Sequence, residues 1–457
     1  FPPELDAVAG LADGYLDDSR RYLERYAGEI GAYPFTEFSV VAGPLPTGFG
    51  MPTLTYMGAE VLKLPFIRAT SLGHEVLHNW WGNGVYVDYA TGNWSEGLTT
   101  FMADYAYKEG ESAEAARATR LAWLRDFAAV PAGSGGTLAG FRSRTHGAAA
   151  AVGYGKAAML FVMLRDAIGE DAFRRGVRAF WAQQRFRSAG WSDLRAAFEQ
   201  ASGRSLAPFF AQWLDRPGGP AVKVARASAQ PEAGKVRLTL ALEQAAPAYA
   251  LRLPLEIVYA GRSETRSADL ARERDVVTLH VDAVPEGVRL DPELRVWRVL
   301  DREQLPPILR QWIVARSPRL AQASTDEDVR AAAAALARRV FEAPPRAVPP
   351  QAMNEGAEPV LLAGLHADVD AALARAGLPA RPASLAGRGT AQVWTVERRA
   401  GPPVAVVSGR DADALRALLG PLPHFGAQSW LVFDGRRAQD RGVWPAPGPL
   451  VAVQAAR

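Results

Sequence analysis

The spacing of apolar positions changes twice along the chain and divides it into three regions. In the first region apolar residues recur every three to four positions, which is typical of helices packed on one face. We expect helices over Leu5–Ile30, Thr70–Trp81, Ser95–Lys108, Ala113–Ala129, Lys156–Gln184 and Trp191–Asp215, and short strands between Tyr33 and Tyr56. The run Pro217-Gly218-Gly219-Pro220 ends this region, because glycine and proline interrupt regular structure.

In the second region apolar and polar residues alternate. The alternating apolar positions are Val236, Leu238, Leu240 and Leu242, then Leu251, Leu253, Leu255 and Ile257, then Val277, Leu279 and Val281. A period of two, interrupted by turn residues, predicts an antiparallel β-sandwich. This region has no cluster of acids or histidines, since His280 stands alone, and we expect it to be a structural support.

The third region alternates strand-like and helix-like segments, which predicts a small α/β domain. Two helices, Ile308–Arg316 and Asp326–Phe341, and a proline-rich linker, Pro344–Pro350, are expected to lead into it. The strands and helices expected after the linker are Val360–Leu365, Ala367–Ala376, Gln392–Val396, Val404–Ser408, Ala412–Leu419 and Trp430–Phe433. No G-x-G-x-x-G motif is present, so no dinucleotide is implied, and packing or partner binding is the expected role.

Composition agrees with a multi-domain α+β protein whose predicted domains are residues 1–219, 220–303 and 304–457. The chain has 457 residues, 48% of them hydrophobic, which is enough for sizeable cores. The net charge is +3 and the basic residues are dispersed, so nucleic acid is not an expected partner. With no cysteine there are no thiolate ligands or disulfides, and no apolar run is long enough to predict a transmembrane segment.

One short stretch carries the chemistry: His74, Glu75 and His78 form an H-E-x-x-H motif. Ser71 can cap the expected helix and Gly82 can end it. Positions four apart lie on one face of a helix, so the two imidazoles face a single point, where they are suited to bind zinc. Glu75 points close to the same side and can take a proton from a water molecule.

A catalytic zinc site needs a third protein ligand, and Glu96 is the best candidate. It follows in W-S-E-G near the start of the next expected helix, with Asn93 or Ser95 as the cap. We therefore predict one Zn²⁺ per chain, held by His74, His78 and Glu96. An intact motif does not by itself show catalysis, so a non-catalytic zinc scaffold that binds partners is the alternative.

The segments H-E-V-L-H-N-W-W-G-N and N-W-S-E-G-L-T-T-F resemble the aminopeptidase N family of gluzincin zinc metallopeptidases. The segment Tyr154-Gly155-Lys156-Ala157 is similar to that family's Tyr-x-Lys-Gly, and Phe209-Phe210-x-x-Trp213-Leu214 is similar to the end of its catalytic domain. The resemblance covers about residues 33–220. It implies a mostly helical, thermolysin-like catalytic domain, a peptide substrate, and a Tyr154 hydroxyl that stabilises the oxyanion.

The sequence departs from the family pattern at two places. Seventeen residues separate His78 from Glu96, one fewer than is usual. The family's Gly-x-Met-Glu-Asn, whose Glu holds the substrate's free amine, is replaced by Gly48-Phe49-Gly50-Met51-Pro52, which contains no Glu. Zinc-dependent peptide-bond hydrolysis is therefore the prediction, and an endopeptidase or another amide hydrolase is an alternative to an aminopeptidase.

Two further expectations concern the surroundings of the site. Arg142, Arg144 and His146 follow a glycine-rich segment, and they either contact a substrate carboxylate in the cleft or form a solvated basic loop. The chain begins at Phe1 with an expected helix, whereas family members have an N-terminal β domain before this point. We expect such a domain of the same precursor to be missing, which favours an exported precursor over a cytoplasmic one.

Overall fold

The computed structural model describes residues 1–45, 48–64, 66–130, 136–143, 151–232, 234–398, 401–444 and 448–455. The chain forms two compact units, which are described separately. Unit 1 contains residues 1–299 and 450–457, and unit 2 contains residues 300–449. The expected mixture of helices and several sheets is confirmed. The predicted helical region and the predicted sandwich both belong to unit 1.

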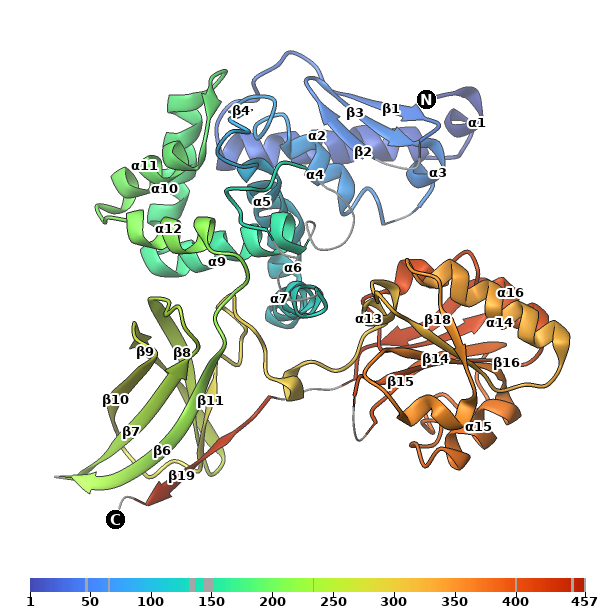
Figure 1. Ribbon diagram of the computed structural model, residues 1–457. Helices are drawn as coiled ribbons and strands as arrows, with labels where there is room; N and C mark the ends of the chain where they lie inside the picture. Colours follow the sequence, from blue (N-terminus) through green and yellow to red (C-terminus); the bar gives the residue numbers. More distant parts are fainter. Residues whose placement is uncertain are drawn as a thin grey trace. The chain divides into compact units, whose positions relative to one another are not determined.

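Unit 1 begins with a helical region that carries a small sheet at one side (Figure 1). The sheet has the order β1-β3-β2, with β1 (Ser39–Gly43), β2 (Gly48–Met51) and β3 (Leu54–Gly58). The helices up to the glycine-rich segment are α1 (Pro3–Asp6), α2 (Leu11–Glu29), α3 (Ala59–Leu62), α4 (Ser71–Leu77), α5 (Trp94–Thr100), the π-helix η1 (Phe101–Tyr105), α6 (Ala106–Glu111) and α7 (Ala113–Ala128).

The helices after that segment form the core of the region. They are the π-helix η2 (Ala151–Lys156), α9 (Ala157–Ile168), α10 (Glu170–Gln184), α11 (Trp191–Ser202) and α12 (Ala207–Asp215), with β5 (Ser188–Ala189) pairing to β4 (Tyr86–Val87). Every residue from Ala157 to Leu164 is buried, so α9 is a central helix. The two long helices expected here are each divided, at Gly169 (φ 86°) and at Gly203 (φ 67°), because glycine adopts the positive φ that ends a helix.

The second part of unit 1 is a seven-stranded sheet with the order β10-β7-β6-β19-β11-β8-β9. Its strands are β6 (Val222–Glu232), β7 (Lys235–Gln244), β8 (Leu251–Tyr259), β9 (Arg262–Leu270), β10 (Arg274–Val281), β11 (Gly287–Leu290) and β19 (Val451–Ala455). The alternating residues expected to face the core do so: Leu238, Leu240, Leu253 and Leu255 are fully buried.

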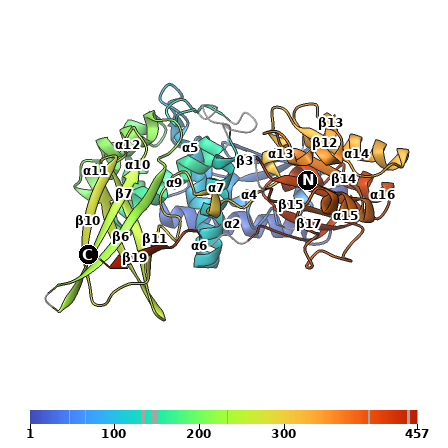
Figure 2. The ribbon, with the colours of Figure 1, turned by 60° about the horizontal axis from the view of Figure 1, so that its bottom comes forward.

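The last strand does not belong to the domain in which the sequence placed it. The domain predicted over residues 304–457 ends at Pro449, and β19 lies between β6 and β11 in unit 1. Figures 1 and 2 both show this strand beside them. Val453 pairs with Ala227 of β6, and Val451 pairs with Val288 of β11. The physical reason is that β19 supplies backbone partners to two strands that would otherwise end in open edges.

Unit 2 is an α/β fold with one mixed sheet of order β13-β12-β14-β16-β15-β17-β18. Its strands are β12 (Arg319–Gln322), β13 (Arg346–Val348), β14 (Val360–Leu365), β15 (Ala391–Val396), β16 (Val404–Gly409), β17 (Trp430–Asp434) and β18 (Arg437–Gly442). Its helices are η3 (Arg302–Gln304), α13 (Arg310–Ile313), α14 (Glu327–Val340), η4 (Pro350–Asn354), α15 (His366–Arg375), α16 (Ala412–Ala417) and η5 (Leu422–Phe425).

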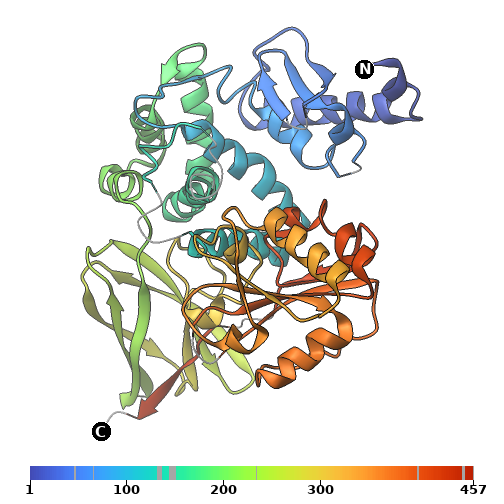
Figure 3. The same cartoon turned by 45° about the vertical axis from the view of Figure 1, so that its right-hand side comes forward.

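The two faces of this sheet are covered by different helices (Figure 3). Leu361 and Val407 pack with α14 and α16, whereas Leu362 and Val406 pack with α15. Successive residues of a strand point to opposite faces, which produces this division. The helix expected over Ile308–Arg316 is shorter than predicted, since α13 covers only Arg310–Ile313. The linker expected over Pro344–Pro350 contains strand β13. None of the helices in the described part of the chain is long and apolar enough to span a membrane.

Candidate metal centre and cleft

Helix α4 places the two motif histidines side by side. His74 lies inside the helix and His78 is its C-terminal cap, and their ring centroids are 4.9 Å apart. Both rings are largely buried, with side chains 14% and 13% exposed. The helix is shorter than predicted, but the four-residue spacing still brings both Nε2 atoms to one point, as the motif requires.

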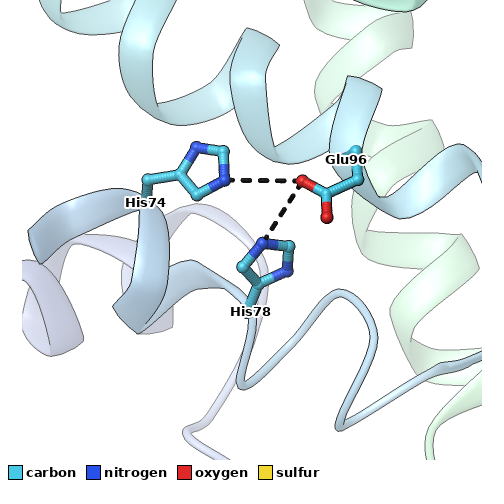
Figure 4. Close-up of side chains that lie close together, drawn as sticks. All are labelled: His74, His78 and Glu96. Atoms are coloured by element: carbon cyan, nitrogen blue, oxygen red, sulfur yellow. Dashed lines mark ion pairs between the residues drawn. The ribbon is translucent and has the colours of Figure 1, made fainter. Parts of the chain in front are cut away.

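Helix α5 supplies the third side chain of the cluster, Glu96. Asn93 caps this helix, because its side-chain oxygen accepts a hydrogen bond from the Ser95 amide at 3.1 Å. Glu96 Oε2 lies 3.6 Å from Nε2 of His74 and 3.6 Å from Nε2 of His78 (Figure 4). The ligand atoms of the three residues all lie within 4.8 Å of one another. The structure therefore brings the three predicted ligands together.

The second nitrogen of each histidine has its own acceptor. His74 Nδ1 lies 2.7 Å from Oδ2 of Asp104, and His78 Nδ1 lies 2.9 Å from the Trp81 carbonyl oxygen. A carbonyl oxygen only accepts, so Nδ1 of His78 donates, and the neutral ring leaves its Nε2 lone pair facing Glu96. The carboxylate of Asp104 likewise accepts from Nδ1 of His74 and so leaves Nε2 of that ring available as a ligand atom.

The sequence analysis missed Asp104, and the π-helix η1 explains why. Asp104 lies eight residues after Glu96, and at 3.6 residues per turn eight residues rotate by ~800°, which leaves the two side chains ~80° apart. A π-turn accommodates one extra residue, which reduces the mismatch to ~20°. Regular helical periodicity therefore places Asp104 off the face of Glu96, whereas the π-helix returns it to the histidines.

The donor set fits a zinc ion. Two imidazoles and one carboxylate form a common ligand set for catalytic zinc, which keeps a further position open for water or substrate. Here both imidazoles have their outer nitrogen fixed by an acceptor, as in most histidine metal ligands. The cluster lies in a cleft, so a fourth position can be reached from outside.

Electrostatics tie the ionisation of these groups together. Burial raises the pKa of Glu75, against the opposing effect of both histidines. Burial lowers the pKa of His74, but Asp104 and Glu96 outweigh it, so that the pKa is raised well above its usual value. Burial also opposes ionisation of Glu96, yet hydrogen bonds from His74 and His78 lower its pKa. Against the effect of burial, Glu96 also raises the pKa of His78, so a metal ion has to compete with protons for both Nε2 atoms.

The cluster forms the floor of a cleft of about 1030 Å³. The backbone of β2 passes directly over it. A Cβ on Gly48 would lie 2.9 Å from Oε1 of Glu75, and a Cβ on Gly50 would lie 2.7 Å from Cβ of His78. Only glycine allows this close approach, so β2 forms one wall next to the Glu75 carboxylate.

Tyr154 and Arg142 also line the cleft. Tyr154 lies in η2, and its ring packs edge-on against Phe141 with the centroids 6.1 Å apart. One Arg142 Nη atom donates to the Ala90 carbonyl oxygen at 3.1 Å, and the other donates to the Ala139 carbonyl oxygen at 2.6 Å. The other two members of the predicted basic group, Arg144 and His146, lie outside the described residues.

Three carboxylates line this cleft among the described residues: Glu75, Glu96 and Asp104. Each already has a neighbour in the histidine cluster. The segments outside the described residues contain no Asp or Glu in the sequence. The cleft as described therefore holds no further carboxylate that could bind a substrate ammonium group.

Comparison with known proteins adds family information to this geometry. Residues 68–213 match the peptidase family M1 domain. Aminopeptidase N of Streptomyces lividans is 26% identical over 266 residues, which cover 52% of this chain and 29% of the relative. Leucyl aminopeptidase of Saccharolobus solfataricus is 26% identical over 232 residues, which cover 48% of this chain and 28% of the relative.

Two further proteins are also similar to this chain over only part of their length. Tricorn protease-interacting factor F2 of Thermoplasma volcanium is 25% identical over 49% of this chain and 30% of its own length. A crystal structure of Legionella pneumophila aminopeptidase A in complex with aspartic acid covers 74% of this chain and 39% of its own, at 16% identity and a TM-score of 0.48. The chain thus spans about a third of these curated relatives. The matched domain over residues 68–213 and the relatives named aminopeptidases thus support the resemblance of this part of the chain to the aminopeptidase-N-like members of peptidase family M1.

Proposed function

We propose that unit 1 is a zinc-dependent peptidase that hydrolyses peptide bonds. The observation that supports this best is the convergence of His74, His78 and Glu96 in one cleft, with Glu75 beside them. A chance cluster would not also have the outer nitrogen of each histidine held by an acceptor. The family of residues 68–213 agrees with this function.

The proposed site residues are those predicted from the sequence: His74, His78 and Glu96 as ligands, with Glu75 and Tyr154 as catalytic groups. When bound, one zinc ion supplies a Lewis acid for the scissile carbonyl and lowers the pKa of water. Burial raises the pKa of the Glu75 carboxylate, which suits it to accept a proton from water and then deliver it to the leaving amine. The Tyr154 hydroxyl donates a hydrogen bond to the developing oxyanion.

Two specificities are supported by different observations. The relatives named aminopeptidases favour removal of N-terminal residues. The carboxylates of the cleft favour cleavage that does not require a free N-terminus. A carboxylate that binds a free ammonium group must not already interact with the histidine cluster, and the cleft as described has no such carboxylate. We infer from the cleft that this chain does not depend on a free substrate amine, and that it also cleaves peptides with a blocked N-terminus.

The test is a digestion of matched peptides with free and N-acetylated ends, read by mass spectrometry, with the metal-chelated protein as control. We expect zinc-dependent cleavage of both sets. If only the peptides with free N-termini are cleaved, the protein is a peptidase that does require a free substrate amine. Stoichiometric zinc binding without any cleavage would contradict the peptidase and favour the non-catalytic scaffold.

A further inference from the structure

A second cavity lies in unit 2, and it does not depend on the function of unit 1. Its volume is about 760 Å³, which lies within the ~300–1000 Å³ of small-molecule sites. It opens where β14 and β16 end, since His366 directly follows β14 and Arg410 directly follows β16. These neighbouring strands run parallel.

The chain leaves the two strands toward opposite faces of the sheet. After β14 it enters α15, which packs on the face that contains Leu362 and Val406. After β16 it enters α16, which packs on the face that contains Leu361 and Val407. In open α/β sheets, ligands bind at the carboxyl ends of strands where the connections diverge in this way. The cavity therefore occupies the position at which this class of fold binds ligands.

The walls of the cavity differ in polarity. One wall is a stripe along α15, made by His366, Asp370 and Ala374 at four-residue spacing. The lining also includes the apolar residues Leu378, Ala380 and Ala386, which follow α15 in the sequence. The polar residues, among them Arg381, Gln392 and Arg410, are grouped near the strand ends. The cavity thus offers a charged end and an apolar body.

A chain of hydrogen bonds fixes the groups at the charged end. Arg381 is 9% exposed, and it donates to Asp370 Oδ1 at 2.9 Å and to Ser408 Oγ at 2.8 Å. Ser408 is fully buried, and its Oγ lies 2.9 Å from Nδ1 of His366. Because the arginine occupies a lone pair of the hydroxyl, the hydroxyl proton is available to Nδ1. A neutral His366 then carries its proton on Nε2, where it can donate to a ligand.

The charges of this end favour an anion. Burial and the two guanidinium groups of Arg381 and Arg410 lower the pKa of His366, and Asp370 opposes them only in part. Asp370 is already paired with Arg381. Arg410 donates from its Nε to Asp411 at 3.1 Å, and among the described residues its terminal nitrogens have no acceptor, so they can bind a ligand. The two arginines thus outweigh Asp370 in their effect on the His366 ring.

We propose that this cavity binds a small organic acid, with its carboxylate or phosphate between His366 Nε2 and Arg410 and its apolar body against Ala374, Leu378 and Ala380. The shared chemistry is an anionic oxygen group joined to a hydrocarbon body. Bidentate acceptance from an arginine and a histidine N–H suits both kinds of headgroup. The buried Arg381 is a positioning residue, which orients Ser408 and through it His366.

The probes are octanoate, octyl phosphate and 1-octanol, titrated into the zinc-loaded full chain by calorimetry. The blocking variant is Ala374→Trp, and its matched control is Ala371→Trp, because Ala371 is exposed on the same helix but does not line the cavity. The charge variant is Arg410→Gln, and its control is Arg375→Gln on the exposed side of α15. Circular dichroism checks that each variant folds.

We expect saturable binding of octanoate or octyl phosphate, weakened at least tenfold by Ala374→Trp and by Arg410→Gln, with both controls within twofold of the unmodified chain. The tighter of the two acids identifies the headgroup. Absence of binding by either acid would overturn the proposal, as would equal affinity for 1-octanol. Binding that survives both cavity variants would also overturn it, since the acid would then sit elsewhere, for example at the metal of unit 1. If Ala374→Trp does not fold, Arg410→Gln alone decides.

Discussion

Asp104 Oδ2 lies 2.7 Å from Nδ1 of His74, whereas the corresponding atom of His78 faces the Trp81 carbonyl oxygen. The two histidines therefore differ in what orients them. A carboxylate can increase the basicity of the ring and stabilise its positive charge, whereas a carbonyl mainly fixes the tautomer. Asp104 is thus the side chain outside the ligand set whose loss should affect the metal centre most directly.

The first prediction concerns this contact. Asp104→Asn should reduce zinc affinity by ~10–100-fold, because the ligand imidazole loses its negatively charged partner. Affinity can be measured by competition with a chromophoric chelator. Glu111→Gln is the control, since Glu111 is exposed and pairs with Lys108 on the surface. Equal zinc affinity in the two variants would show that the contact does not support the centre.

The second prediction separates metal binding from turnover. Glu75→Gln should retain zinc at full stoichiometry but reduce kcat by ~10²–10⁴-fold, because the amide cannot accept a proton from water. Zinc content and peptide hydrolysis are measured on the same preparation. An unchanged kcat would remove Glu75 from the mechanism.

The third prediction concerns the oxyanion. Tyr154→Phe keeps the ring that packs on Phe141 and removes only the hydroxyl group. We expect kcat to fall by ~10²–10³-fold with little change in KM, since the donor acts mainly in the transition state. Single-turnover kinetics distinguish this from a binding defect. A rise in KM at constant kcat would assign Tyr154 to substrate binding instead.

The fourth prediction uses pH. Lys156 is fully buried, and its Nζ donates to the Arg216 carbonyl oxygen at 2.6 Å. Burial lowers the pKa of Lys156 from 10.5 to about 8. The unfolded chain therefore binds more protons than the folded chain between these pH values, so this group makes the protein more stable as pH rises from about 8 to 10.5.

Urea denaturation at several pH values measures this contribution. The full effect of Lys156 is at most roughly 3 to 4 kcal/mol, since its pKa is lowered from 10.5 to about 8 and each pKa unit corresponds to about 1.36 kcal/mol. In Lys156→Met the rise in stability over this pH range should be smaller by that amount. An identical pH profile in the variant would mean that Lys156 does not titrate in this range in the folded chain.

The fifth prediction concerns the β2 wall. A methyl group on Gly50 would lie 2.7 Å from His78 Cβ and 3.2 Å from the Glu75 carbonyl oxygen. Gly50→Ala must therefore displace either β2 or helix α4. We expect a loss of stability of ~1–3 kcal/mol together with weaker zinc binding. Gly110→Ala is the matched control, because its methyl group meets nothing within 4 Å and the substitution favours a helix. Equal stability of the two variants would contradict the close approach.

The cluster of the three proposed ligands could be predicted because its geometry is local. His74 and His78 are separated by one helical turn, and Glu96 lies near a capped helix start, so short-range rules place all three. Asp104 could not be predicted in the same way, because its position depends on the extra residue of η1. The signal to look for would have been a π-helix after Glu96, the proposed third ligand.

The strands likewise divide into those that local sequence predicts and those that depend on distant partners. The strands with buried residues were predicted closely, and the bounds predicted for Val360–Leu365 are those of β14. The strands that were missed, such as β12, β13 and β19, are short and are defined by partners far away in the sequence. The sequence of β19 shows its alternation, but not that its partners are β6 and β11.

The position of β19 has a practical consequence for anyone who truncates this protein. A stop codon placed at the start of unit 2, after residue 299, would remove the α/β fold. It would also remove β19, the strand that lies between β6 and β11. The shortened product would expose two unpaired strand edges, which are templates for aggregation. An expression plasmid for unit 1 alone should therefore join residue 299 to residue 450 through a short flexible linker and keep the final strand.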